Sequence, residues 1–275
     1  ATDQAGFEIR VNGSAIPLSV PVRSIVVSKE FNTISSARIA ILDGDPSAES
    51  FEWSNSEYFI PGNEIEILAG YQQDHDSIFK GVVVAQKLRA REGSNPALIV
   101  ECRDKAYRMT LGRKNRYFYD MTDSDILDEI LAEYSLQKEL ESTSVTHPQM
   151  VQYHSTDWDF AVLRAEANKM LLLPDDGKLV MSKPDVNASE AFSVIYGASM
   201  IEFDGLVDTR LQAENTRASS WSFTNQEVVE EEGSPVGEAE IGNLSADDQA
   251  SSGGYTEEHL RHSGVQASDE LKEWA

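Results

Sequence analysis

Apolar and polar residues alternate along the first hundred positions in short runs that turn-forming residues separate. Residues 7–11 alternate in this way, and Asn12 and Gly13 then supply the positive backbone dihedrals that a tight hairpin turn needs. The same period of two is repeated in the runs 22–28, 36–42, 64–68, 78–90 and 97–103. Gly, Pro, Asn and Asp interrupt the chain at 43–46, 60–63 and 92–96. Short strands with no helical pattern between them predict an antiparallel β-sandwich or β-barrel.

The periodicity becomes helical beyond residue 120. Thr122 and Asp125 have the spacing of a capping box. The apolar residues after them fall on one face of a helix: Ile126, Leu127, Ile130, Leu131 and Tyr134. A second helix is predicted from Thr156, because Asp159 repeats the capping spacing and apolar residues follow at steps of three and four through Met170. We therefore expect a helical region after the first block of strands.

A second group of strands is predicted after the helices. Residues 171–173 and 178–181 form a predicted hairpin around the turn at 174–177. Weaker strand candidates follow at 191–196, 200–203 and 219–223. The predicted fold class is therefore mainly β with α insertions.

The last part of the chain is rich in Gly, Ser and acidic residues. No structure is predicted for residues 230–250, and Ser and Gly at 251–254 read as a flexible joint. A short helix is predicted from Ser268, capped by its hydroxyl, with Leu271 and Trp274 on one side. Because this helix is cut short at residue 275, we expect the chain to be a fragment of something longer.

Length and composition suit a globular protein of about two domains. The chain has 275 residues, of which 40% are hydrophobic and 25% charged. Its net charge of −24 repels a phosphate backbone, so no stable nucleic-acid binding is expected. Cys102 is the only cysteine, so no intramolecular disulfide can form, which fits assembly in a reducing cytoplasm. No apolar run approaches the roughly 20 residues of a membrane span, so no transmembrane segment is expected.

Two candidate sites suggest a catalytic or a sugar-binding function. Asp157 and Asp159 flank Trp158, and a pair of carboxylates is the apparatus of a hydrolase acting on cell-wall polymer. Capping of the second helix accounts for both acids without a substrate. Trp53, Trp158 and Trp221 offer aromatic faces on which sugars stack, as in a carbohydrate-binding β-module, although core packing also explains them.

The remaining candidates for chemistry are weaker. Cys102 lies in an alternating run, where a buried structural thiol is expected and not a nucleophile. His259 and His262 follow Glu257 and Glu258 and would supply metal ligands only on a helix. The sequence at 43–45 (DGD) begins like a calcium loop but lacks its closing glutamate. We therefore predict no catalytic, cofactor-binding or metal-binding residue and no enzyme activity.

The order of several motifs along the chain is more informative than any one of them. Residues 61–71 read PG-x-x-I-x-I-x-x-GY, and residues 79–83 continue as F-x-G-x-V. A predicted strand then ends in Asp104. Residues 152–160 (QYHSTDWDF) lead into Ala-Glu-Ala at 165–167. In this order the motifs resemble the VgrG and phage late-control D family of baseplate hub proteins in contractile injection machines.

The resemblance implies two tail-tube-like antiparallel β-barrels joined by a helical region. The implied domains are 1–115 (first barrel), 116–170 (helical connecting region), 171–229 (second barrel) and 230–275 (acidic linker and start of a C-terminal helix). It also implies a homotrimer whose six barrels match a hexameric inner tube. The implied partners are the inner tube protein, the spike or needle, and baseplate proteins.

The family also sets an expectation for the setting of the protein. The resemblance implies assembly in the bacterial cytoplasm and then a place in a phage tail, a type VI secretion spike or an extracellular tailocin-like particle. In full spike proteins of the family, an oligonucleotide-binding-type β-domain and a β-helical needle follow the hub. We expect these residues to be the hub portion alone.

Overall fold

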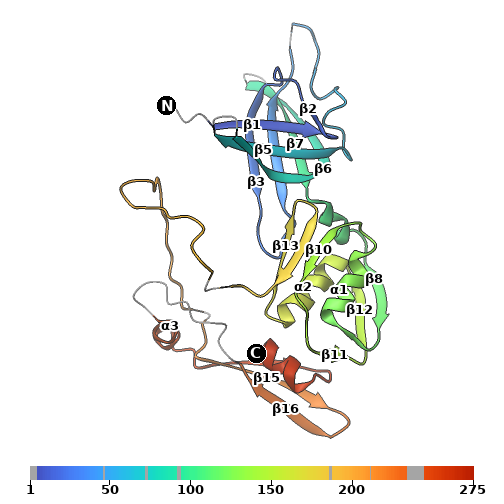
Figure 1. Cartoon of the computed structure of the whole chain (residues 1–275), viewed down its shortest axis with the longest axis vertical. Coiled ribbons are helices and arrows are strands. Elements are labelled where there is room, and N and C mark those ends of the chain that lie inside the picture. Colours follow the sequence, from blue (N-terminus) through green and yellow to red (C-terminus); the bar gives the residue numbers. More distant parts are fainter. Residues whose placement is uncertain are drawn as a thin grey trace. The chain divides into compact units, whose positions relative to one another are not determined.

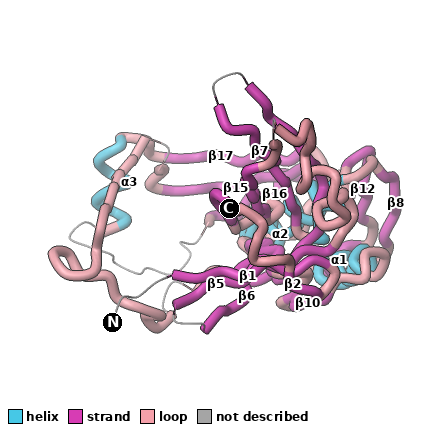
Figure 2. Tube along the Cα trace, turned by 90° about the horizontal axis from the view of Figure 1, so that it is seen from above, coloured by secondary structure: helices cyan, strands magenta, loops and turns pink. Residues whose placement is uncertain are grey.

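The computed structural model describes residues 5–45, 47–71, 74–91, 94–185, 188–210, 212–233 and 245–275. These residues belong to two compact units. The first unit consists of Ala1–Ala165 and Leu171–Ser182, and the second of Glu166–Met170 and Lys183–Ala275. Strands make up most of the regular structure (Figure 2), so the predicted mainly β class is confirmed.

A seven-stranded antiparallel sheet forms the N-terminal part of the first unit (Figure 1). Its strands are β1 (Ala5–Val11), β2 (Ser14–Ala15), β3 (Val22–Ser28), β4 (Ser36–Leu42), β5 (Glu64–Tyr71), β6 (Asp74–Arg91) and β7 (Ser94–Arg103). The order is β2-β1-β5-β6-β7-β4-β3. Every alternating run predicted in this region is a strand. No ladder joins β2 to β3 among the described residues, so the sheet is open where the predicted barrel would be closed.

One apolar core lies against this sheet and draws side chains from both of its halves. Ile39, Ile67, Phe79 and Leu98 are fully buried in it, together with Cys102. Since side chains alternate between the two faces of a strand, these positions are the apolar members of each period-two run. The turn predicted at 92–96 lies partly outside the described residues, which omit 92 and 93.

Two glycines of the motif in this sheet lie where no side chain fits. A Cβ atom on Gly81 would lie 2.2 Å from the carbonyl oxygen of Arg103, and one on Gly70 would lie 1.8 Å from that of Asp74. Both are close approaches of neighbouring strands, because β6 pairs with β7 and with β5. The motif glycines are therefore explained by the packing of the backbone.

The first unit continues with one 3-10 helix (η1), two α-helices and three small sheets. The elements are η1 (Lys105–Thr110), β8 (Lys114–Phe118), β9 (Met121–Thr122), α1 (Asp123–Leu131), β10 (Gln137–Leu140), β11 (Thr146–His147), β12 (Met150–Ser155), α2 (Asp157–Ala167), β13 (Leu171–Asp175) and β14 (Lys178–Ser182). β8 pairs with β12, β9 with β11, and β14 lies between β10 and β13. The β13–β14 hairpin predicted at 171–181 is confirmed.

Both predicted helices begin where their caps place them. Thr122 forms the capping box with Asp125, and the Thr156 hydroxyl oxygen accepts from the backbone N–H of Asp159 at 3.0 Å. Both helices end earlier than predicted, so Tyr134 lies three residues past α1 and Met170 three past α2. The apolar periodicity continues past each helix because these side chains still face the protein interior or a polar network.

The turn of the β13–β14 hairpin is hydrogen-bonded to residues at one end of the large sheet. Asp104, the aspartate at the end of β7, accepts from the backbone N–H groups of Ala106 and Gly177, each at 2.8 Å. The buried Ser35 hydroxyl donates to the Pro174 carbonyl oxygen at 2.7 Å. Lys29 also pairs with Asp175 and Asp176. The two hydrogen bonds that Asp104 accepts explain why a buried aspartate follows β7.

The described residues of the second unit form one three-stranded sheet and two short helices. Its elements are β15 (Asn215–Ser222), β16 (Glu227–Glu232), α3 (Ala246–Gly253), β17 (Glu257–His262) and α4 (Ser268–Trp274). β15 is antiparallel to β16 and parallel to β17. The strands expected to form a second barrel are therefore divided between two sheets, and neither sheet is closed within the described ranges.

Several sequence predictions for this unit are wrong. Residues 191–196 and 200–203 are loop and turn instead of strands, because no neighbouring strand pairs with their backbone in the described part of the chain. The predicted unstructured region, 230–250, contains the end of β16 and the first part of the helix α3, which Ser245 caps; its residues 234–244 lie outside the described residues. The predicted joint at 251–254 is the end of α3, where Gly254 has the left-handed conformation of a C-cap (φ 68°).

The last helix differs from its prediction in its cap. α4 begins at Ser268, but Ala267 occupies the N-cap position, and the Ser268 hydroxyl donates to Glu231. Leu271 is fully buried, as predicted for one side of this helix. No helix within the described ranges is long and apolar enough to span a membrane.

Candidate functional site

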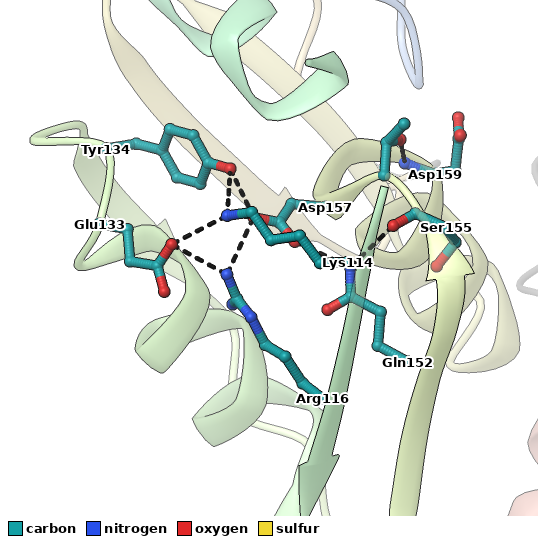
Figure 3. A network of polar contacts seen from close by, with 9 residues as sticks. Lys114, Arg116, Glu133, Tyr134, Gln152, Ser155, Asp157 and Asp159 are labelled. Atoms are coloured by element: carbon teal, nitrogen blue, oxygen red, sulfur yellow. Dashed lines mark hydrogen bonds and ion pairs between the residues drawn. The ribbon is translucent and has the colours of Figure 1, made fainter. Parts of the chain in front are cut away.

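A buried carboxylate organises the middle of the first unit (Figure 3). Asp157 is the first residue of α2, and its side chain is completely buried. Its Oδ2 atom accepts from Lys114 Nζ at 2.7 Å, from Arg116 Nη2 at 3.3 Å and from the Tyr134 hydroxyl. Its Oδ1 atom accepts from Gln152 Nε2 at 2.8 Å. Four side chains therefore donate to one carboxylate.

Four separate segments supply this polar network. Lys114 and Arg116 point to the same side of β8 because they are two residues apart, and Gln152 on β12 lies directly opposite Arg116 in the ladder. Glu133 follows α1, and its Oε2 accepts from Lys114 at 2.9 Å and from Arg116 at 2.8 Å. Two cations thus face two carboxylates. The network ties the β8–β12 sheet to both helices.

The charges in the network keep Asp157 ionised. Burial acts to raise the pKa of Asp157, but hydrogen bonds from Lys114, Tyr134 and Gln152 and the charge of Arg116 outweigh burial and lower it. Burial acts to lower the pKa of Lys114, and its bonds to Asp157 and Glu133 raise it well above the ordinary value. Neither group exchanges a proton near neutral pH. The network is suited to holding elements together and not to acid–base chemistry.

A second buried carboxylate repeats this arrangement nearby. Asp123, at the start of α1, accepts from Arg164 of α2 through Nε at 2.6 Å and Nη2 at 2.9 Å. His147 Nε2 lies 3.1 Å from Oδ2, the same oxygen that Arg164 Nη2 contacts. A two-pronged guanidinium contact of this kind fixes the orientation of both partners. α1 and α2 are therefore held together by ionic contacts at their polar ends.

The fold and this geometry can be compared with known proteins. A family model described as the Alg8 N-terminal domain matches residues 1–275. The chain belongs to the Alg8 N-terminal domain family. No curated protein matches the chain significantly.

Solved structures with a similar fold include tail proteins of phages. The 43 kDa tail protein of prophage MuSo2 from Shewanella oneidensis is 12% identical, with a TM-score of 0.65, over 98% of this chain and 76% of that one. The tail protein from Neisseria meningitidis MC58 is 14% identical, with a TM-score of 0.66, over 98% and 74%. A chain of the Francisella PdpA-VgrG complex in its lidded form is 11% identical, with a TM-score of 0.53, over 98% and 42%.

These comparisons refine the resemblance drawn from the motifs. The fold is that of phage tail proteins and of a VgrG complex, as the motif order implied. The family whose model matches is the Alg8 N-terminal domain and not the late-control D family. At these low identities the likeness shows the fold alone.

The two acids proposed for a hydrolase have different surroundings. Asp157 is enclosed by four donors, whereas Asp159 is exposed and its N–H donates to Thr156. A substrate has no access to the Asp157 oxygens. The paired acids are explained by the network and by the helix cap.

Each tryptophan considered for sugar stacking has its own surroundings. Trp53 packs against the core of the large sheet, and Trp158 is buried at the start of α2. Trp221 lies on β15 in the second unit and is 40% exposed. Core packing therefore accounts for the first two, as the sequence already suggested.

The surroundings of Cys102 and of the calcium-like turn at 43–45 fit a structural role. Cys102 is buried on β7, and burial raises the pKa of its thiol to about 12, so the thiolate is not available as a nucleophile. The Asp43 carboxylate accepts from the backbone N–H groups of Trp53 at 3.0 Å and Ser54 at 2.7 Å. It clasps a loop.

The histidines of the second unit are not arranged for a metal. They lie on the strand β17, so a separation of three residues points them to opposite faces. His259 Nε2 and the Ser219 hydroxyl are 2.9 Å apart, while the His262 ring meets the Trp274 ring edge-on at 6.0 Å. No group of three potential ligands that could hold a metal occurs among the residues that the structure describes.

Sequence reasoning missed most members of the Asp157 network. Local patterns do not single out Lys114 or Arg116, and they place Tyr134 on a helix face. Two features of the sequence point to the network. Lys114 and Arg116 have the spacing of residues on one strand face, and motif residues are clustered at 152–160. Inside that motif, Gln152 and Asp157 bond each other, Thr156 caps the helix, and Trp158 is buried.

Proposed function

We propose that this chain is a structural component of a contractile injection machine, acting at the hub between the inner tube and the spike. The observation that carries the proposal is a tail-protein fold over 98% of the chain. We further propose a homotrimer, in which the strand-rich parts 1–115 and 171–229 supply six barrel-like modules to match a hexameric tube. The inner tube protein, the spike or needle and baseplate proteins are then its partners.

The proposed role needs no catalysis. Two buried carboxylates of the first unit, Asp157 and Asp123, are engaged in ion pairs between elements. Networks of this kind keep a module rigid while force passes through it. The proposed path of the protein is assembly in the bacterial cytoplasm and incorporation into a phage tail, a type VI secretion spike or a tailocin-like particle.

Electron microscopy of particles from the native host tests this function. An epitope-tagged chain is expressed from its own locus, particles are separated on a density gradient, and the tag is labelled with gold. We expect the label at one end of tube-bearing particles, at their baseplate. Recovery of the chain only in light fractions free of such particles would overturn the proposal.

A further inference from the structure

Residues 191–207 of the second unit form neither helix nor strand (Figure 1). They nevertheless expose a run of large apolar side chains. The exposed side chains are Phe192, Val194, Ile195, Tyr196, Ile201, Phe203, Leu206 and Val207. Four of them, Phe192, Tyr196, Ile201 and Leu206, are at least 82% exposed. Soluble monomers rarely expose apolar patches larger than a few hundred Å², and larger patches mark interaction sites. We call residues 191–207 the apolar loop.

The apolar loop has a defined turn at its centre. The carbonyl oxygen of Ile195 accepts from the backbone N–H groups of Ala198, Ser199 and Met200 at 3.0–3.1 Å. The Ile195 N–H donates to the Ser199 hydroxyl at 2.9 Å. The turn gives the loop two arms that both carry apolar side chains. Part of the entropy that docking would cost is therefore already lost in the free chain.

The first unit has an apolar surface of its own on the outer face of the β8–β12 sheet. Tyr117 and Val151 lie opposite each other in the ladder, Tyr153 lies two residues from Val151 along β12, and Tyr119 directly follows β8. Their exposed fractions run from 38% for Val151 to 81% for Tyr153. The opposite face of the sheet buries Phe118 and Gln152. We call these four exposed residues the tyrosine face.

Charge and area make the two surfaces complementary. Glu202 and Asp204 flank Phe203 in the apolar loop, and all three are exposed. The exposed Arg113 lies beside the tyrosine face, where its guanidinium donates to the His154 carbonyl oxygen at 3.3 Å. Since an aromatic side chain buries about 150–250 Å², the loop offers area on the order of the roughly 800 Å² per partner in a standard interface.

We propose that the apolar loop of one copy docks on the tyrosine face of a second copy, with Glu202 and Asp204 toward Arg113. The chain carries a net charge of −24, so copies repel one another overall, and association must come from local apolar and charge-complementary contacts. Such a contact joins two different surfaces and forms a ring when its rotation closes. The inference deepens the proposed hub function and rests on it only for the number of copies in the ring.

Cysteine cross-linking between two variants tests the predicted contact. Phe203→Cys is placed in one tagged chain and Tyr153→Cys in a differently tagged chain, and the two are mixed under oxidising conditions. The native Cys102 is buried and stays silent. We expect a disulfide-linked dimer that carries both tags. Links only between identical variants, or none while the native chain associates, would overturn the contact.

Sedimentation velocity measures how much the apolar loop contributes to the stability of the oligomer. Ile201→Ser with Phe203→Ser is expected to raise the dissociation constant of the oligomer by about tenfold or more, because central apolar side chains dominate interface energetics. Leu18→Ser is the matched control, since Leu18 is fully exposed and lies outside both surfaces. Glu202→Lys should weaken association, and Arg113→Glu in the same chain should restore it.

The outcomes separate this inference from the proposed function. A native chain that stays monomeric at the highest attainable concentration, or an oligomer unchanged by the loop substitutions, overturns the docking. Gold-labelled particles would leave the hub function standing in that case. Conversely, a cross-linked ring in a host without tail-like particles supports the docking and overturns the hub.

Discussion

The side chain of Gln152 donates to Asp157 Oδ1 at 2.8 Å, and both side chains are fully buried. This bond links the strand β12 to the first turn of α2, five residues further along the chain. The other oxygen of Asp157 faces Lys114 and Arg116 of β8. One carboxylate thus fixes the position of a helix against a sheet. Its removal should therefore destabilise the first unit.

We expect Asp157→Asn to lower the free energy of unfolding by about 3–5 kcal/mol, because removing one partner of a buried ion pair leaves the other charges uncompensated. Urea denaturation followed by circular dichroism measures the change. Asp159→Asn is the matched control, because Asp159 is exposed in the same helical turn. Its loss should cost only about 0.3–1 kcal/mol through the helix macrodipole. Equal losses in the two variants would contradict the role given to Asp157.

Acid should weaken the protein partly through Asp157. The pKa of this carboxyl in the folded protein lies below its ordinary value of 3.8, so the unfolded chain binds the proton more tightly. Its stabilising contribution is fully present above that value and is lost as the pH falls through the lower folded-state pKa. The unfolding free energy of the native chain should therefore fall more steeply at acidic pH than that of Asp157→Asn. Parallel pH profiles would count against this account.

Gly81→Ala should destabilise the large sheet. The added Cβ would lie 2.2 Å from the Arg103 carbonyl oxygen, so β6 and β7 must separate locally, at a cost of about 1–3 kcal/mol. Thermal unfolding of the purified variant measures this cost. Gly6→Ala is the control, since the nearest atoms there belong to the His75 ring, which can move aside. A Gly81→Ala protein as stable as the control would show that the strands are not held this closely.

The thiol of Cys102 should be unreactive in the folded protein. Burial on β7 raises its pKa to about 12, so almost no thiolate exists near neutral pH. Ellman's reagent should therefore detect one thiol only after denaturation. Rapid reaction of the native protein would mean that the core around Cys102 opens readily.

Local patterns determined much of this fold. The period-two runs located six of the seven strands of the large sheet, all except β2, and the cap at Thr122 located the start of α1 to the residue. These features are predictable because strand alternation and capping depend on residues within a few positions of one another. The start of α2 followed from the Thr156 cap for the same reason.

Tertiary structure decided the rest. The network around Asp157 joins residues from 114 to 157, and no local rule says which cations will meet that carboxylate. The pattern at 191–196 is that of a strand, but a strand also needs a partner for its backbone, and the chain places none beside it in its described part. Its apolar side chains therefore remain exposed. Sequence alone thus determined which segments favour each local conformation, whereas long-range pairing decided which of them became part of a sheet, because backbone hydrogen bonds in a sheet come from distant residues.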